Sequence, residues 1–225
     1  MLKRLYSKLL RWAFARFYRE FAWTYDLVAA IVSRGLWSRW IEAAVPQLQG
    51  ERVLELGSGT GYLQRALHRG GIPSIGLDAS PYMLWLARRK IEHAGGAARL
   101  LHAYAQHLPF AGSTFSDLVA TFPAEYILDP ATFAEAWRVL RPGGQIVLID
   151  SAYFTRRDAY SAAVEAAYVV TQQVRAKDPR PGLLQAAGFE VVESWVDVGA
   201  SRVQILRGIK RGLRTQDQSN KRTKN

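Results

Sequence analysis

The chain has no cysteine and only four histidines among its 225 residues. Without cysteine it has no disulfides, no thiolate metal site and no cysteine nucleophile. The histidines form no HxxxH-type pair, so we expect no metal centre. No stretch is long and apolar enough to span a bilayer, and no uninterrupted apolar run follows the basic N-terminus. We therefore expect no cleaved signal peptide.

The positive charge is concentrated at the two ends of the chain. The formal net charge is +11, of which residues 1–42 carry +5 and residues 203–225 carry +6, while residues 43–202 are neutral. A nucleic-acid enzyme would more often carry basic charge around its active-site face. Basic ends on a neutral centre instead favour contact of the termini with an anionic surface such as a membrane.

The N-terminal part is helical by its pattern. Residues 2–19 predict a basic amphipathic helix, and residues 20–45 continue as helix with a break near 33–35. Two interpretations of the first helix stay open: it lies on a membrane surface, or it packs over the domain's own cleft. We therefore divide the chain into a helical extension or lid (1–45), a folded domain (46–210) and a basic, disordered tail (211–225).

From residue 51 on, strand-like runs alternate with helical patterns. The expected strands are 52–56, 74–78, 99–103, a part of 115–122, 145–150, 189–196 and 202–207. The expected helices are 61–69, 81–94, 131–140, 160–173 and 183–187. This alternation predicts an α/β fold, with a doubly wound, mostly parallel seven-stranded sheet and helices on both faces.

The first strand ends in a glycine turn. Glycines allow a sharp turn and a close approach of the backbone to a ligand. The dinucleotide-binding fingerprint needs glycines at its first, third and sixth positions, but the sixth position here is Tyr62. Gly57, Gly59 and Gly61, with Glu55 two residues before the first, instead resemble motif I of the class I S-adenosylmethionine-dependent methyltransferases.

Two later segments agree with that resemblance. Asp78 ends the next strand, where a carboxylate can accept hydrogen bonds from both ribose hydroxyls; the alternative is an N-cap role near Ser80-Pro81. Residues 104–110, Tyr-Ala-Gln-His-Leu-Pro-Phe, resemble the segment that lies along the adenine in these enzymes. The family's usual Asp is Tyr104 here, so the backbone of Ala105 or the amide of Gln106 would take its place.

Further likenesses follow along the chain. Ser116 replaces a usual acid, with Asp117 beside it, and Arg-Pro-Gly-Gly at 141–144 resembles a turn of the family. Residues 182–189 resemble the lead into the final strands. Tyr25-Asp26 resembles a pair that precedes motif I in the ubiquinone/menaquinone-biosynthesis group, the small-molecule subfamily that this chain resembles most.

The resemblance implies a Rossmann-like fold with S-adenosylmethionine as methyl donor and S-adenosylhomocysteine as product. It implies donor contacts at a set of residues in and around the strand ends: Tyr25, Glu55, Gly57, Ser58, Gly59, Gly61, Asp78, Ala79, Ala105, Gln106 and Thr121.

We expect the acceptor site beyond the fourth strand, at residues 121–126. Phe122 and Pro123 offer an apolar wall, and the segment lacks the signature of amino-directed base methyltransferases. Glu125 and Tyr126 are the candidates for proton handling; alternatively, Glu125 is solvated and Tyr126 packs. The aromatic residues of the N-terminal helices and of 151–181 favour an apolar or lipid-like acceptor, or belong to an ordinary core.

Our first hypothesis is methyl transfer by in-line displacement to a small apolar molecule, such as a quinone precursor or a lipid. An RNA or protein methyltransferase that docks through its basic ends is the second. A non-catalytic, membrane-associated module that binds S-adenosylmethionine is the third. We expect a cytoplasmic protein, peripheral at the membrane if residues 1–20 and the tail bind an anionic surface. The sequence does not predict the oligomeric state.

Overall fold

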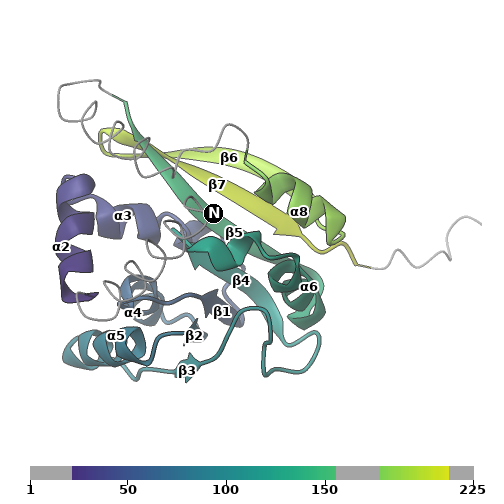
Figure 1. The fold of residues 1–225 in the computed structure, drawn as a ribbon, viewed down its shortest axis with the longest axis horizontal. Helices are drawn as coiled ribbons and strands as arrows, with labels where there is room; N and C mark the ends of the chain where they lie inside the picture. The colour runs from purple at the N-terminus through teal and green to yellow at the C-terminus, as the bar shows by residue number, and fades with distance from the viewer. Residues whose placement is uncertain (1–21, 156–177, 213–225) are drawn as a thin grey trace, which may run out of the picture.

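The computed structural model describes residues 22–155 and 178–212. Within these ranges the chain forms one sheet with helices on both faces (Figure 1). The strands are β1 (Val53–Leu56), β2 (Ser74–Asp78), β3 (Leu100–His102), β4 (Phe115–Thr121), β5 (Leu140–Phe154), β6 (Glu190–Val198) and β7 (Ser201–Ile209). The helices are α2 (Ala22–Val32), α3 (Trp37–Glu42), α4 (Tyr62–Arg69), α5 (Pro81–His93), α6 (Pro130–Val139) and α8 (Arg180–Ala186), with 3₁₀ turns η1 (Val45–Gln47) and η2 (Glu125–Leu128).

The sheet has seven strands in the order β3-β2-β1-β4-β5-β7-β6. The strands β1 to β5 pair in parallel, and β7 runs antiparallel between β5 and β6. The chain reverses its direction of winding between β1 and β4, and in such sheets ligands bind at the carboxyl ends of the strands beside that point. The fold predicted from the alternating pattern is thus confirmed.

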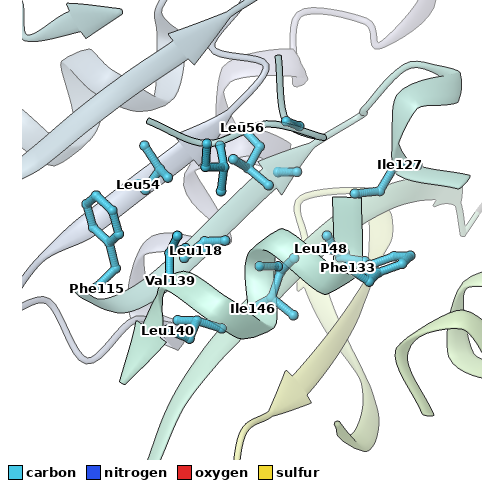
Figure 2. Packing of buried hydrophobic residues seen from close by; sticks show 14 of the residues in the cluster. Leu54, Leu56, Phe115, Leu118, Ile127, Phe133, Val139, Leu140, Ile146 and Leu148 are labelled. Atoms are coloured by element: carbon cyan, nitrogen blue, oxygen red, sulfur yellow. The ribbon is translucent and has the colours of Figure 1, made fainter. Parts of the chain in front are cut away.

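Two cores cover the two faces of the sheet because side chains alternate along each strand. Leu54 and Leu56 of β1 pack on the face that α6 and α8 cover, with Phe133 of α6 fully buried among them (Figure 2). Val53, one residue earlier, faces the other core, which includes Trp40 of α3 and Leu63 of α4. The odd-numbered residue Glu55 therefore projects toward α4 rather than into the larger core.

The helices begin and end where local chemistry dictates. Ser80 caps α5 by accepting a hydrogen bond from the Met83 amide at 3.4 Å, and Asp129 caps α6 through the Ala131 amide at 3.0 Å. A proline follows each cap, where its missing N–H costs nothing. The break expected near 33–35 is present between α2 and α3, with Arg34 and Gly35 at φ values of 53° and 78°.

The strand β5 differs from its predicted span. It begins five residues earlier than expected and continues to Phe154. The glycine turn at 141–144 lies inside it as an irregularity, since Leu140 pairs with Phe115 and Gln145 with Asp117. The Gly143 amide donates to the Lys210 carbonyl at 2.8 Å. The residue that follows β7 therefore holds this turn against the sheet.

The acidic side chain of Asp117 lies at the amino end of β4, away from the ligand-binding edge. It is fully buried and accepts hydrogen bonds from the amides of Gln49 and Gly50, at 3.0 and 3.2 Å. Gln145 and Ser116 donate to it from their side chains, at 2.9 and 2.8 Å. Asp117 therefore accepts hydrogen bonds from the backbone amides of the segment that leads into β1.

The predicted helices at 2–19 and 160–173 and the tail from residue 213 lie outside the described residues. Among the helices that the structure describes, none has the length and hydropathy to cross a membrane.

Candidate functional site

The glycine loop after β1 has the backbone that its sequence predicts. Gly57, Gly59 and Gly61 have φ values of 72°, 50° and 83°, a region that other residues rarely adopt. A Cβ on Gly61 would meet the Cβ of Ala87 at 2.9 Å, so this glycine lets α4 pack closely on α5. A Cβ on Gly59 would meet no atom within 4 Å, so open space borders the middle of the loop.

Asp78, at the carboxyl end of β2, is joined to this loop. The Gly59 amide donates to its Oδ2 at 2.8 Å, and the Ser80 amide donates to its Oδ1 at 2.8 Å. Partial burial raises the pKa of Asp78, while these two amides and the nearby His102 act in the opposite direction. Ser80, and not Asp78, caps α5. An ionised carboxylate has about four acceptor positions, so Asp78 keeps acceptor capacity for two hydroxyl groups.

Glu55 is buried on the other side of the loop, with 1% of its surface exposed. Gln64 of α4 donates to its Oε2 at 2.9 Å, and Ser74 donates to the Gln64 amide oxygen at 3.1 Å. Burial raises the pKa of Glu55 to about 8, and the negative charge of Asp78 adds to the effect. The Glu55 side chain is therefore largely protonated at neutral pH. Gln64 was missed from sequence because nothing in its spacing identifies it as a partner.

The side chain of Ser58 points into the protein. Its Oγ is buried and has no hydrogen-bond partner among the described residues, and its Cβ lies opposite Gly76 of β2. The Ser58 amide donates to the Leu77 carbonyl at 2.8 Å. This residue thus holds the loop against β2.

The segment after β3 lies beside the end of β2. Ala105 is buried, and the Gln106 amide nitrogen lies 3.4 Å from Oδ2 of Asp129. Ala79 is exposed, and its carbonyl accepts a hydrogen bond from Nε2 of His102 at 3.1 Å. Tyr104, at the position of the family's acid, is 59% exposed.

The end of β4 carries an aromatic wall. Phe122, directly after Thr121, has a φ of 46°, which is strained for a bulky side chain. Its ring stacks on Trp37 of α3 with a centroid distance of 4.4 Å, and Trp40 lies 6.1 Å from it. Phe154 of β5 lies 5.8 Å from Trp40. We call Trp37, Trp40, Phe122 and Phe154 the aromatic cluster.

The two candidates for proton handling have different surroundings. Glu125, the first residue of η2, is exposed. Tyr126 is half-buried, and its hydroxyl donates to the Leu56 carbonyl at 2.7 Å. A Cβ on Gly57 would lie 2.5 Å from that hydroxyl, so Tyr126 sits directly against the first glycine of the loop.

The structure thus brings most of the predicted donor residues to one edge of the sheet, around the ends of β1, β2 and β4. Tyr25 lies in α2, but its side chain is outside what the structure describes. Among the described residues, no group of three or more histidine and acidic side chains could hold a metal ion.

This topology, with a glycine loop after β1 and a carboxylate at the end of β2, defines a class I methyltransferase. A methyltransferase-domain family model matches residues 53–144. The chain is 30% identical over 216 residues to the demethylmenaquinone methyltransferase of Clavibacter sepedonicus, covering 85% of this chain and 87% of that protein. The chain belongs to the S-adenosylmethionine-dependent methyltransferases of small molecules.

Two further similarities agree with this family. The chain is 35% identical over 158 residues to the phosphatidylethanolamine N-methyltransferase of Cereibacter sphaeroides, covering 69% of this chain and 75% of that protein. The fold is similar to that of an S-adenosylmethionine-dependent methyltransferase from Thermotoga maritima, with a TM-score of 0.61, 21% identity and coverage of 87% and 99% of the two chains. The hypotheses of an RNA or protein methyltransferase and of a non-catalytic module are not favoured.

The residues present fit the methyl donor. S-adenosylmethionine supplies a methyl group already activated on a sulfonium sulfur. The open space at Gly59 and the remaining acceptor capacity of Asp78 suit a ribose at the loop. The donor contacts assigned to the individual residues by sequence remain predictions.

The raised pKa of Glu55 makes the stability of the fold depend on pH. Because the folded state raises its pKa to about 8, the folded chain holds a proton that the unfolded chain releases above its ordinary pKa of 4.5. The free energy of unfolding should therefore fall as pH rises from 5 to 8, by roughly 1 kcal/mol per pH unit from this group. Glu55→Gln should remove this contribution in urea titrations at pH 5.5 and 7.5.

The matched control is Glu193→Gln, because Glu193 also accepts from a glutamine amide, Gln204 at 2.7 Å, but is exposed. This variant should keep the pH dependence of the wild type. An unchanged pH dependence in Glu55→Gln would contradict the assignment.

We expect the Asp78 carboxylate to strengthen binding of S-adenosylmethionine. Asp78→Ala removes the acceptor for ribose hydroxyls, and each hydrogen bond to a charged group is worth about 1.5–3 kcal/mol. We expect the Kd for S-adenosylmethionine to rise about 100-fold or more in isothermal titration calorimetry, with the circular dichroism spectrum retained. The exposed Asp197, which pairs with Arg202, provides the control Asp197→Ala. Equal Kd values for Asp78→Ala and the wild type would refute the role of Asp78.

Proposed function

We propose that the enzyme methylates a lipid-like acceptor, whose reacting head group enters beyond the end of β4 while its apolar chain lies against the aromatic cluster. The observation that carries this proposal is the cluster itself. Phe122 follows β4 directly, has a strained positive φ and stacks on Trp37. Strained residues cluster at functional sites, and aromatic side chains are typical linings of small-molecule sites.

The names of the relatives support an acceptor of this kind. One is a demethylmenaquinone methyltransferase and the other a phosphatidylethanolamine N-methyltransferase. Both acceptors are lipids, although the methyl group goes to carbon in a quinone ring and to nitrogen in the phospholipid. The two acceptors share a long apolar chain. We therefore propose that the acceptor of this enzyme also carries such a chain.

A hollow at the edge of the aromatic cluster is consistent with a long acceptor. It has a volume of about 240 Å³ and is lined by Phe154 of the cluster together with Tyr153, Thr155, Trp195 and Arg202. The ring centroids of Tyr153 and Trp195 lie 5.8 Å apart. The hollow meets the aromatic cluster at Phe154, while the Tyr153 ring projects from the opposite face of β5 because side chains alternate along a strand.

The chemistry asks mainly for alignment. Holding the acceptor atom in line with the activated methyl group can contribute about 7–11 kcal/mol to lowering the barrier. An acceptor that must lose a proton also needs a base. We assign this role to Glu125, because it is exposed at the start of η2, and we assign Tyr126 a positioning role, because its hydroxyl already donates to the Leu56 carbonyl.

A lipid acceptor places the enzyme at a membrane surface. The basic charge of residues 1–42 and 203–225 supports attraction to anionic lipid head groups, worth about 1 kcal/mol for each basic residue near the surface. We therefore propose a cytoplasmic enzyme that associates peripherally with the membrane.

The acceptor proposal predicts where a labelled methyl group goes. We expect methyl-labelled S-adenosylmethionine to label demethylmenaquinone or phosphatidylethanolamine in detergent micelles. The kcat/KM should be at least about tenfold higher than for the matching head group without its chain, because burial of each CH₂ is worth about 0.8 kcal/mol. Equal rates with and without the chain, or label only in tRNA or histone, would contradict the proposal.

If Glu125 is the general base, Glu125→Gln should slow methylation of whichever of the two lipids has the higher kcat/KM. A general base contributes a factor of about 100 or more, so kcat should fall by about that factor while the KM for S-adenosylmethionine stays the same. Glu193→Gln serves as the control on the far strand pair. A normal kcat in Glu125→Gln would remove Glu125 from the mechanism.

A further inference from the structure

A polar contact joins three separate parts of the chain beside the donor site. The Thr60 hydroxyl donates to Oδ1 of Asp26 at 2.8 Å, and the Lys90 ammonium forms an ion pair with Oδ2 of Asp26 at 2.7 Å. Lys90 also donates to the Thr60 hydroxyl at 3.1 Å. Asp26 belongs to α2, Thr60 to the glycine loop and Lys90 to α5, so the contact closes a triangle across these elements.

The contact is shielded from water. Thr60 is 3% exposed, and the side chains of Lys90 and Asp26 are 23% and 31% exposed. The Lys90 ammonium also lies 3.9 Å from the ring centroid of Tyr62, the first residue of α4. Burial lowers the pKa of Lys90, while Asp26 raises it and helps to keep the lysine charged. Ion pairs of this partly buried kind are stronger than exposed ones.

Between residues 26 and 31, the large apolar side chains of α2 are exposed. Its inward side carries Asp26 and the small Ala29, and the buried Ser33 follows at the same spacing directly after the helix. The large apolar side chains Leu27 and Val28 are 56% and 51% exposed. Burial of large side chains between residues 26 and 31 therefore contributes little to holding α2, which lies at the outside of the molecule beside α3 (Figure 1).

Thr60 lies between the last two glycines of the loop that faces the donor. Its neighbour Gly59 donates to Asp78, and its neighbour Gly61 starts α4 against α5. Both neighbours are glycines with positive φ, and glycine loses more conformational freedom on ordering than any other residue. Fixing the Thr60 side chain therefore removes much of the freedom of the loop before any ligand binds.

We propose that Asp26 is a positioning residue that fixes the glycine loop through Thr60 and thereby couples the docking of α2 to binding of the methyl donor. This inference rests on the S-adenosylmethionine-dependent activity. Because linkage is reciprocal, a donor bound at the loop stabilises the docked position of α2, and a docked α2 strengthens donor binding by the same factor.

The first test compares S-adenosylhomocysteine affinities by isothermal titration calorimetry. Asp26→Asn keeps the shape but loses the ion pair, and Thr60→Val keeps the shape but loses the hydroxyl. We expect each to raise the Kd about tenfold, within the usual range of coupling factors. Thr60→Ser restores the hydroxyl and should bind within about twofold of the wild type.

The control is Glu42→Gln. Glu42 of α3 forms an ion pair with Arg69 of α4 at the same 2.7 Å, but this pair is exposed and does not touch the loop. It should leave the Kd unchanged. An equal loss of affinity in Glu42→Gln and Asp26→Asn would reduce Asp26 to a general structural contact and overturn the proposal.

The second test measures hydrogen exchange in α2 with and without S-adenosylhomocysteine. Residues 26–32 should gain protection on binding in the wild type and gain much less in Asp26→Asn. The outcomes are distinguishable. A wild-type chain that does not bind S-adenosylhomocysteine would overturn the donor itself. A wild-type chain that binds, alongside an Asp26→Asn variant with normal Kd and normal protection of α2, would overturn only the role of Asp26.

Discussion

The hydrogen bond from the Gly59 amide to the Asp78 carboxylate joins the ends of two neighbouring parallel strands, and the donor site depends on it. The bond measures 2.8 Å and fixes the middle of the glycine loop relative to β2. It lies in a loop whose three glycines all have a positive φ, a conformation that other residues rarely adopt. Parallel pairing of β1 with β2 brings the two ends to the same edge.

Each side of this loop has its own support. Ser58 and Gly76 hold it against β2, Tyr126 closes against Gly57, and the contact of Asp26 with Thr60 holds it from the N-terminal side. A site that binds a flexible ligand gains affinity when the protein is ordered in advance, because less entropy is lost on binding. The loop is thus rich in glycine, yet its surroundings leave it little freedom.

The sequence predicted the sheet well because its signals are local. The apolar runs, the glycine turn at 57–61 and the serine and proline at 80–81 each specify a short stretch of backbone, and the strands lie within a few residues of their predicted spans. The exception is β5. Its extension at 151–154 pairs with β7, more than 45 residues later, and its extension at 140–144 is bonded to Phe115 of β4 and to Lys210 after β7. Pairing over that distance leaves no local pattern.

The environment of the site residues could be predicted less well. Glu55 was expected as a donor contact, but its burial against Gln64 depends on how α4 packs on β1. Asp26 was noted only as part of a pair with Tyr25, because its partners Thr60 and Lys90 lie 34 and 64 residues away. Phe122 was expected as an apolar wall, but no local pattern encodes its positive φ or its stacking on Trp37.

The most direct test of the account is a crystal structure of the enzyme with S-adenosylhomocysteine. Both ribose hydroxyls should lie within about 3.2 Å of the Asp78 carboxylate. The adenine should lie along Ala105 and Gln106, and the sulfur should point toward the end of β4 at Phe122. A ligand bound elsewhere, or bound at the loop without contact to Asp78, would contradict it.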